Sequence, residues 1–344
     1  MATRHLTHTR HQRLVTVQSR GSAQRPPPRL HSVRMLASLA FAQPTPQPGE
    51  WSDDESPLAW TNNRTRNGNS HERNTQFLPY MSARIAALSQ IEGHLKATGR
   101  WHHGPLMTHR DVYQFGVYTG GGLWTWLNGR HMKGNTLSMH GLGEAMRDRE
   151  SRVFGFDSFQ GMPDEPSELV PRNIRRSKED LKVWAAGGLN AAEQMGYRSW
   201  PEMRTQLIRN VGYNASRTHL IRGFYNRSLT GRSLAQQLDM RPAFLIDIDC
   251  DLYSSAGQAL RFVLAARLLV PGTLVYYDDS PRAEWVRKMG STNPMVEGEQ
   301  RAHLEISKAF GLRWRLLDGN CTSSACGAEF NLRPVLELVS ASGS

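Results

Sequence analysis

The chain has 344 residues, a hydrophobic fraction of 39 % and a formal net charge of +11. A chain of this length can bury one large core or two small ones. Its apolar runs all fall short of the roughly 18 residues that a membrane-spanning helix needs, so we expect no membrane partner.

The positive charge is concentrated at the N-terminus. Residues 1–49 contain seven arginines and no aspartate or glutamate, which leaves +4 for the rest of the chain. An acid-free basic segment of this kind is typical of a mitochondrial or plastid transit peptide, and a disordered tail in a cytoplasmic protein is the alternative. The remainder is only mildly basic, so we expect no nucleic-acid partner.

Residues 50–79 are polar and are interpreted as a linker, and residues 80–344 are expected to form one domain. Ile85, Leu88, Ile91 and Leu95 recur at helical spacing, which predicts a first helix packed at the edge of that domain. Helix and strand signals then alternate to the end of the chain. The alternation predicts a doubly wound, Rossmann-like α/β fold with a mainly parallel sheet.

Five apolar runs are predicted to be strands, at residues 111–117, 152–156, 219–221, 243–248 and 273–277. Ser254 and Ser255 are expected to cap the helix that follows the fourth strand. Residues 314–317 and 335–339 are expected to close the sheet as an antiparallel pair. Residues 164–215 form a long insertion that we interpret as a lid or acceptor wall.

A glycine-rich turn follows the first predicted strand, in the segment Gln114-Phe-Gly-Val-Tyr-Thr-Gly-Gly-Gly122. Glycines at a strand–helix junction let the backbone turn sharply and approach a ligand closely. The segment lacks the Gly-Lys-Ser/Thr of a phosphate loop, and its spacing departs from the dinucleotide fingerprint. A plain tight turn is the alternative.

Carboxylates follow three of the predicted strands. Asp157 ends the second strand, where a carboxylate can accept both hydroxyls of a ribose. Asp247, Asp249 and Asp251 alternate after the fourth strand, and Asp278 and Asp279 end the fifth. Clustered carboxylates repel one another and need a cation or a shared proton, and oxygen ligands favour Mg²⁺ or Ca²⁺. The alternative is that one or two cap helices and the others are solvated.

Four motifs, in order along residues 105–310, together resemble the macrocin O-methyltransferase family: Phe-Gly-Val-Tyr-Thr-Gly-Gly, Phe-Asp-Ser-Phe-Gln-Gly-Met-Pro, Asp-Cys-Asp-Leu-Tyr-Ser-Ser and Tyr-Asp-Asp. That family consists of metal-dependent class I methyltransferases that use S-adenosylmethionine and act on sugar hydroxyls. The resemblance implies a methyltransferase sheet with a closing antiparallel strand.

The resemblance also implies roles for individual residues. Mg²⁺ would be bound by Asp249, Asp278 and Asp279, and Asp251 would take the proton from the acceptor hydroxyl. The cofactor contacts that it implies are Gln114, Gly116, Tyr118, Gly120, Asp157, Ser158, Gly223 and Phe224. Among these, the two glycines of the turn would line the methionine and ribose, and Gly223 and Phe224 would lie near the adenine.

Gln114 and His303 leave alternatives open for the function and for the catalytic base. Gln114 stands where the family usually has Glu, so we expect weaker cofactor binding, or a non-catalytic cofactor-binding protein as one alternative. His303 is a second candidate for the base or for an acceptor contact. We expect a small-molecule acceptor with a sugar or polyol-like hydroxyl; a catechol-like or nitrogen acceptor and a homo-oligomeric state stay open.

Overall fold

The computed structural model describes residues 78–100, 109–128, 151–166, 169, 184–279, 297–317 and 333–341. The chain divides into Met1–Asp54 and Glu55–Ser344, and all described residues belong to the second unit. The transit peptide predicted at 1–49 lies outside the described residues, as does nearly all of the linker predicted at 50–79. Among the described helices, none is both long and apolar enough to cross a bilayer.

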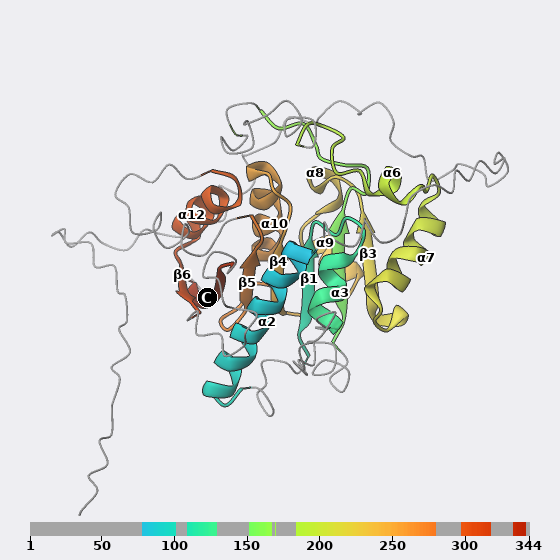
Figure 1. Cartoon of the computed structure of the whole chain (residues 1–344). Coiled ribbons are helices and arrows are strands. Elements are labelled where there is room, and N and C mark those ends of the chain that lie inside the picture. Colours follow the sequence, from blue (N-terminus) through green and yellow to red (C-terminus); the bar gives the residue numbers. More distant parts are fainter. Residues whose placement is uncertain are drawn as a thin grey trace, which may run out of the picture. The chain divides into compact units, whose positions relative to one another are not determined.

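One seven-stranded sheet forms the centre of the described part, in the order β3-β2-β1-β4-β5-β7-β6 (Figure 1). β1 to β5 run parallel, and β7 lies antiparallel between β5 and β6. The strands are β1 (Asp111–Phe115), β2 (Val153–Asp157), β3 (Thr218–Arg222), β4 (Ala243–Ile248), β5 (Leu274–Tyr277), β6 (Leu312–Leu316) and β7 (Val335–Ala341). This arrangement confirms the predicted fold class, including the closing antiparallel strand.

Helices cover both faces of the sheet. α2 (Leu78–Ala97), α3 (Gly121–Asn128) and α7 (Trp200–Val211) lie side by side on one face (Figure 1). α8 (Tyr225–Ser228), α10 (Tyr253–Ala265) and α12 (Gly298–Phe310) pack together on the other, over aromatic side chains of β1 and β2. The shorter α6 (Ala191–Met195), η2 (Ala215–Arg217) and α9 (Arg232–Gln237) lie in the connections. Because both faces are covered, all residues of β1, β4 and β5 are buried, which explains the apolar runs of β4 before Asp247 and of β5.

Two local predictions are wrong. α10 begins after Leu252, which provides no side-chain cap, so neither Ser254 nor Ser255 is the N-cap. α2 does not pack at the edge of the domain: it contacts α3, and its Arg84 reaches Asp247 on the central strand β4.

The insertion predicted at 164–215 is partly a layer of the fold. α7 packs against α3 and connects β2 to β3 as a crossover helix of a doubly wound sheet. Residues 170–183 lie outside the described residues, so the lid role stays a prediction.

Candidate active site

The glycine turn meets the end of β4 where the strand order reverses. Sequential strands extend from β1 in one direction and from β4 in the other, and such a switch point opens a crevice at the carboxyl ends of the strands. Gly116 has φ +91°, and a Cβ there would lie 1.6 Å from the carbonyl oxygen of Asp249. Only glycine fits this position, so the backbone of the turn lies directly against the acidic segment.

Gln114 and Gly120 shape the rest of the turn. Gly120 has φ +89°, and its N–H donates to the Val117 carbonyl at 2.9 Å before α3 begins. Gln114 is fully buried, and its Nε2 donates to the Gly116 carbonyl at 2.8 Å. Its Oε1 is a buried acceptor with no partner among the described residues, so it can accept a donor from a ligand.

Asp157 ties the turn after β1 to the turn after β2. Its Oδ2 accepts from the N–H groups of Val117 and Tyr118 at 2.9 and 2.8 Å, and its Oδ1 accepts from Phe159 at 2.6 Å. Burial raises the pKa of this carboxyl group, while the three N–H donors oppose the rise. A carboxylate has about four acceptor sites, so ribose binding by Asp157 stays a prediction compatible with these bonds.

The other predicted cofactor contacts lie at the same end of the sheet. The N–H of Gly223 donates to the Asp157 carbonyl at 2.9 Å, and Phe224 is the N-cap residue of α8. Tyr118 adopts a φ of +50°, and its pKa is raised by burial and by Asp157. The Ser158 hydroxyl donates to the Gly161 carbonyl at 2.6 Å and accepts from the Gln160 N–H at 3.0 Å, so it shapes its own loop.

Three predicted acids surround a buried arginine that sequence reasoning missed. The Arg84 guanidinium lies 3.2 Å from Asp247, 2.5 Å from Asp249 and 3.3 Å from Asp278, and its side chain is 4 % exposed. Burial alone would lower the pKa of Arg84, but the three carboxylates outweigh it and raise that pKa well above its ordinary value. α2 therefore supplies a fixed cation to the ends of β4 and β5.

Two aromatic side chains complete this ion cluster. Trp126 donates from Nε1 to Asp247 Oδ2 at 2.7 Å, and the Tyr276 hydroxyl donates to Asp278 Oδ1 at 2.6 Å. Arg84 lies over the Tyr276 ring, 5.4 Å from its centroid. Burial, opposed by Arg84, raises the pKa of Asp247 to about 6.

A second acidic group lies beside the first. Asp251 and Asp279 are in side-chain hydrogen-bonding contact, and burial followed by mutual repulsion raises the pKa of Asp251 well above its ordinary value. Glu299, at the start of α12, accepts from the N–H groups of Cys250 and Asp251 at 3.0 and 3.1 Å. The structure thus brings the predicted base beside one predicted metal ligand.

The predicted magnesium ligands are close together but already have protein partners. Asp249 and Asp278 contact Arg84, and Asp279 contacts Asp251. Within the described ranges, no three His, Cys, Asp or Glu side chains are arranged as metal ligands. Carboxylate oxygens are the ligand type that hard divalent cations prefer, so the residue types fit Mg²⁺ although their present arrangement does not.

His303 lies on the buried face of α12. It is 1 % exposed, its Nδ1 lies 2.8 Å from the Tyr277 hydroxyl, and its ring packs against Trp314. Burial lowers its pKa to about 3. This position gives His303 a packing role, and its part as base or acceptor contact stays a prediction without support from its surroundings.

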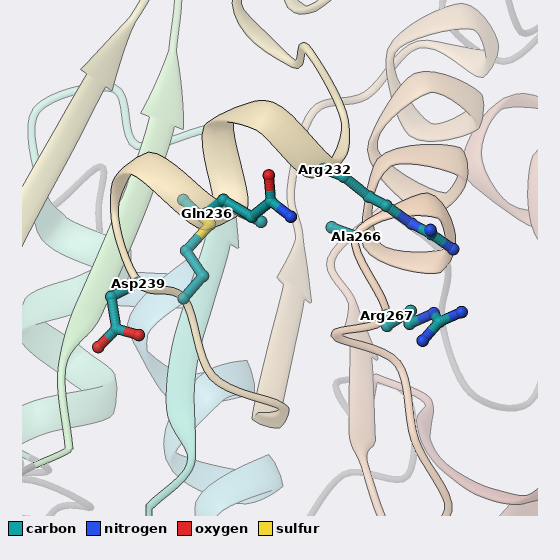
Figure 2. A pocket seen from close by; sticks show the side chains of 7 residues that line it. Arg232, Gln236, Asp239, Ala266 and Arg267 are labelled. Carbon is teal, nitrogen blue, oxygen red and sulfur yellow. The ribbon is translucent and has the colours of Figure 1, made fainter.

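A surface cavity of about 380 Å³ lies at the other end of α10 and contains none of the predicted site residues (Figure 2). Its lining includes Arg232, Gln236 and Asp239, from α9 and the residues after it, and Ala266 and Arg267, which follow α10. α10 starts at the acidic turn and leads away from it, so this cavity is separate from the candidate active site.

No protein family model matches the chain, and no curated protein matches it. Among solved structures, the calicheamicin methyltransferase CalS11 is 19 % identical over 79 % of this chain and 87 % of its own, with a TM-score of 0.44. The O-methyltransferase NovP is 17 % identical over 75 % and 80 %, with a TM-score of 0.45. An O-methyltransferase from Bacillus cereus, in complex with S-adenosylhomocysteine, is 14 % identical over 80 % and 94 %, with a TM-score of 0.37. These likenesses are too remote to assign an activity.

Proposed function

We propose that this chain is an S-adenosylmethionine-dependent O-methyltransferase acting on a hydroxyl of a small sugar or polyol-like molecule. The observation that supports it most is the contact between the Gly116 turn and the Asp249 backbone at the switch point. That contact joins a turn suited to a nucleoside-type cofactor with a buried acidic group. In the sequence, both elements belong to motifs that resemble the macrocin O-methyltransferase family.

Methyl transfer to an alcohol needs a base and a fixed line of attack. The sulfonium of the cofactor is already an activated donor, whereas a hydroxyl is a poor nucleophile until its proton is removed. Asp251 is the proposed base, because its carboxyl group follows β4 and lies in contact with Asp279, a proposed ligand of the metal that would orient the hydroxyl. The orphan Oε1 of Gln114 is suited to the ammonium of the cofactor.

Mg²⁺ is the proposed metal, held by Asp249, Asp278 and Asp279. A bound dication would lower the pKa of the acceptor hydroxyls and orient them. When ionised, Asp247, Asp249 and Asp278 together carry three negative charges against the single positive charge of Arg84. This excess of carboxylates over Arg84 can be neutralised by protons or by a divalent cation, and the metal-binding measurement below decides between them.

The test combines binding and transfer. Calorimetry should detect S-adenosylhomocysteine binding to the wild-type chain, and labelled S-adenosylmethionine should methylate methyl β-D-glucopyranoside in preference to catechol or an aromatic amine. Asp251→Asn should retain S-adenosylhomocysteine binding and lose about 10²-fold or more in kcat, the usual contribution of a general base. No binding of S-adenosylhomocysteine at millimolar concentration would refute the proposed function, and preference for catechol or the amine would move it to the alternative acceptor class.

Metal dependence has its own measurement. Mn²⁺, used as a spin probe for the Mg²⁺ site, should bind the wild type and bind at least tenfold more weakly to Asp279→Asn. Equal Mn²⁺ affinity of the two proteins would exclude Asp279 as a ligand. Full transfer activity after exhaustive EDTA treatment would remove the metal from the mechanism.

A further inference from the structure

The turn between β4 and α10 contains a backbone conformation that needs support from outside. Asp251 has φ +63°, in the left-handed region that costs a non-glycine residue about 1–2 kcal/mol. Leu252, the N-cap of α10, offers no side-chain acceptor to the first N–H groups of the helix. The donors of this turn therefore need acceptors from other parts of the chain.

Two carboxylates from distant segments provide those acceptors. Glu299 Oε1 accepts from both Cys250 and Asp251, and Glu165 Oε1 accepts from the Ser254 N–H at 3.0 Å. Each of these bonds gives a backbone donor an acceptor that the turn itself does not provide. Glu299 therefore binds the backbone before α10, and Glu165 binds the backbone of the first helical turn of α10.

We propose that Glu299 is a positioning residue that fixes the backbone of Cys250 and Asp251, so that the Asp251 carboxyl group faces Asp279 and the acceptor. The inference rests on the proposed function in one respect, the role of Asp251 as base. Glu299 is 2 % exposed, and both of its bonds go to the peptide groups on either side of Cys250, the second of which leads directly into Asp251. A shift of about 1 Å in a reacting group lowers the rate by roughly 10²-fold, so holding this backbone matters directly for transfer.

An isosteric substitution distinguishes whether Glu299 acts by placing an acceptor oxygen or by its negative charge. Glu299→Gln keeps an acceptor oxygen at the place of Oε1 but removes the negative charge, whereas Glu299→Ala removes both. If Glu299 acts by position, the glutamine variant should keep kcat within about fivefold of wild type, and the alanine variant should lose about 10²-fold. S-adenosylhomocysteine affinity should change less than threefold in both, because the hydrogen bonds of Glu299 go to Cys250 and Asp251 and not to the glycine turn itself.

Cys250 offers a readout that does not require activity. Its thiol lies in the held turn and is partly buried, so its alkylation by iodoacetamide, followed peptide by peptide in the mass spectrometer, reports on the order of that turn. We expect about a tenfold faster alkylation in Glu299→Ala and little change in Glu299→Gln, since local opening exposes the thiol. Glu165→Ala is the matched control, because it removes an acceptor from the same helix start without touching Cys250 or Asp251.

Failure of the positioning role of Glu299 can be distinguished from failure of the proposed function. In an Asp251→Asn background, Glu299→Ala should cause no further loss of kcat, because residues that act through one another are not additive. Equal losses in the glutamine and alanine variants, or unchanged Cys250 alkylation in the alanine variant, would overturn the proposal. If the alanine variant does not fold, Glu299→Asp, which is one methylene too short, should take its place with at least tenfold lower kcat than the glutamine variant. If the wild type transfers no methyl group, the proposed function fails, and the alkylation rates still decide whether Glu299 holds the turn.

Discussion

Replacing Arg84 by methionine tests the ion cluster directly. The substitution keeps most of the volume of the side chain and removes the guanidinium that contacts Asp247, Asp249 and Asp278. The side chains of Arg84, Asp247 and Asp278 are 4 %, 0 % and 4 % exposed, so the carboxylates of Asp247 and Asp278 cannot be solvated when Arg84 is removed, whereas that of Asp249 is 27 % exposed. Removing one partner of a buried ion pair costs about 3–5 kcal/mol of the free energy of unfolding. A loss of about 4 kcal/mol corresponds to roughly a 10³-fold change in the unfolding equilibrium.

The loss should depend on pH in a defined direction. The pKa of Asp247 is already raised to about 6 by burial, and removing Arg84 removes the main opposing influence. A carboxyl group with a raised pKa in the folded state stabilises the fold below its unfolded pKa, near 4, and this contribution disappears as the pH rises through the folded pKa. The variant should therefore be penalised most above pH 6 and less near pH 5.

Urea unfolding followed by tryptophan fluorescence, in EDTA at pH 7.5 and at pH 5, measures both effects. Arg301→Met is the matched control, because Arg301 and Glu305 form a surface pair, 41 % and 47 % exposed, whose loss costs less than about 1 kcal/mol. A penalty below about 1 kcal/mol for Arg84→Met at pH 7.5, or the same penalty at both pH values, would refute the electrostatic account.

Three further predictions follow from the same geometry. Gly116→Ala should reduce S-adenosylhomocysteine affinity at least 10²-fold in calorimetry, because its Cβ would overlap a carbonyl oxygen, whereas Gly121→Ala, which meets nothing within 4 Å, should bind normally. Wild-type protein in EDTA should lose stability as the pH rises from about 4 to 7, because burial raises the pKa of both Asp247 and Asp279 to about 6; a rise in the urea midpoint over that range would contradict this. Trp126→Phe should cost about 1.5–3 kcal/mol in urea unfolding through loss of one hydrogen bond to a buried carboxylate, and an unchanged midpoint would show that this bond is not needed.

The sheet was predictable because its strands are buried on both faces. The run from residue 243 to 248 matches β4 to the residue, since nothing polar interrupts it before Asp247. The closing antiparallel pair was predicted a residue or two from its observed bounds. The cap of α10 was not predictable by local rules, because the acceptor for the Ser254 N–H in its first turn comes from Glu165, 89 residues earlier in the chain.

The acids of the site were predictable from their spacing, but their counter-ion was not. Arg84 lies on the same helical stripe as Leu88, Ile91 and Leu95, and a charged residue on an apolar stripe was the signal that could have located it. Glu299 gave no such signal, because a single Glu at the start of a helix is usually explained by the helix dipole. The pairing of acidic and basic side chains depends on tertiary contacts, which the spacing of residues along the sequence does not reveal.

The position of Arg84 on α2, near the start of the domain, also determines when the ion cluster can form during folding. The carboxylates that it binds on β4 and directly after it lie 163 and 165 residues later in the chain, so this helix cannot dock until most of the sheet has formed. Contacts of such long sequence separation slow folding, because a large loop must close before the contact is gained. An early intermediate would therefore have a partly formed sheet, an undocked helix and exposed apolar surface, which makes it a candidate substrate for chaperones.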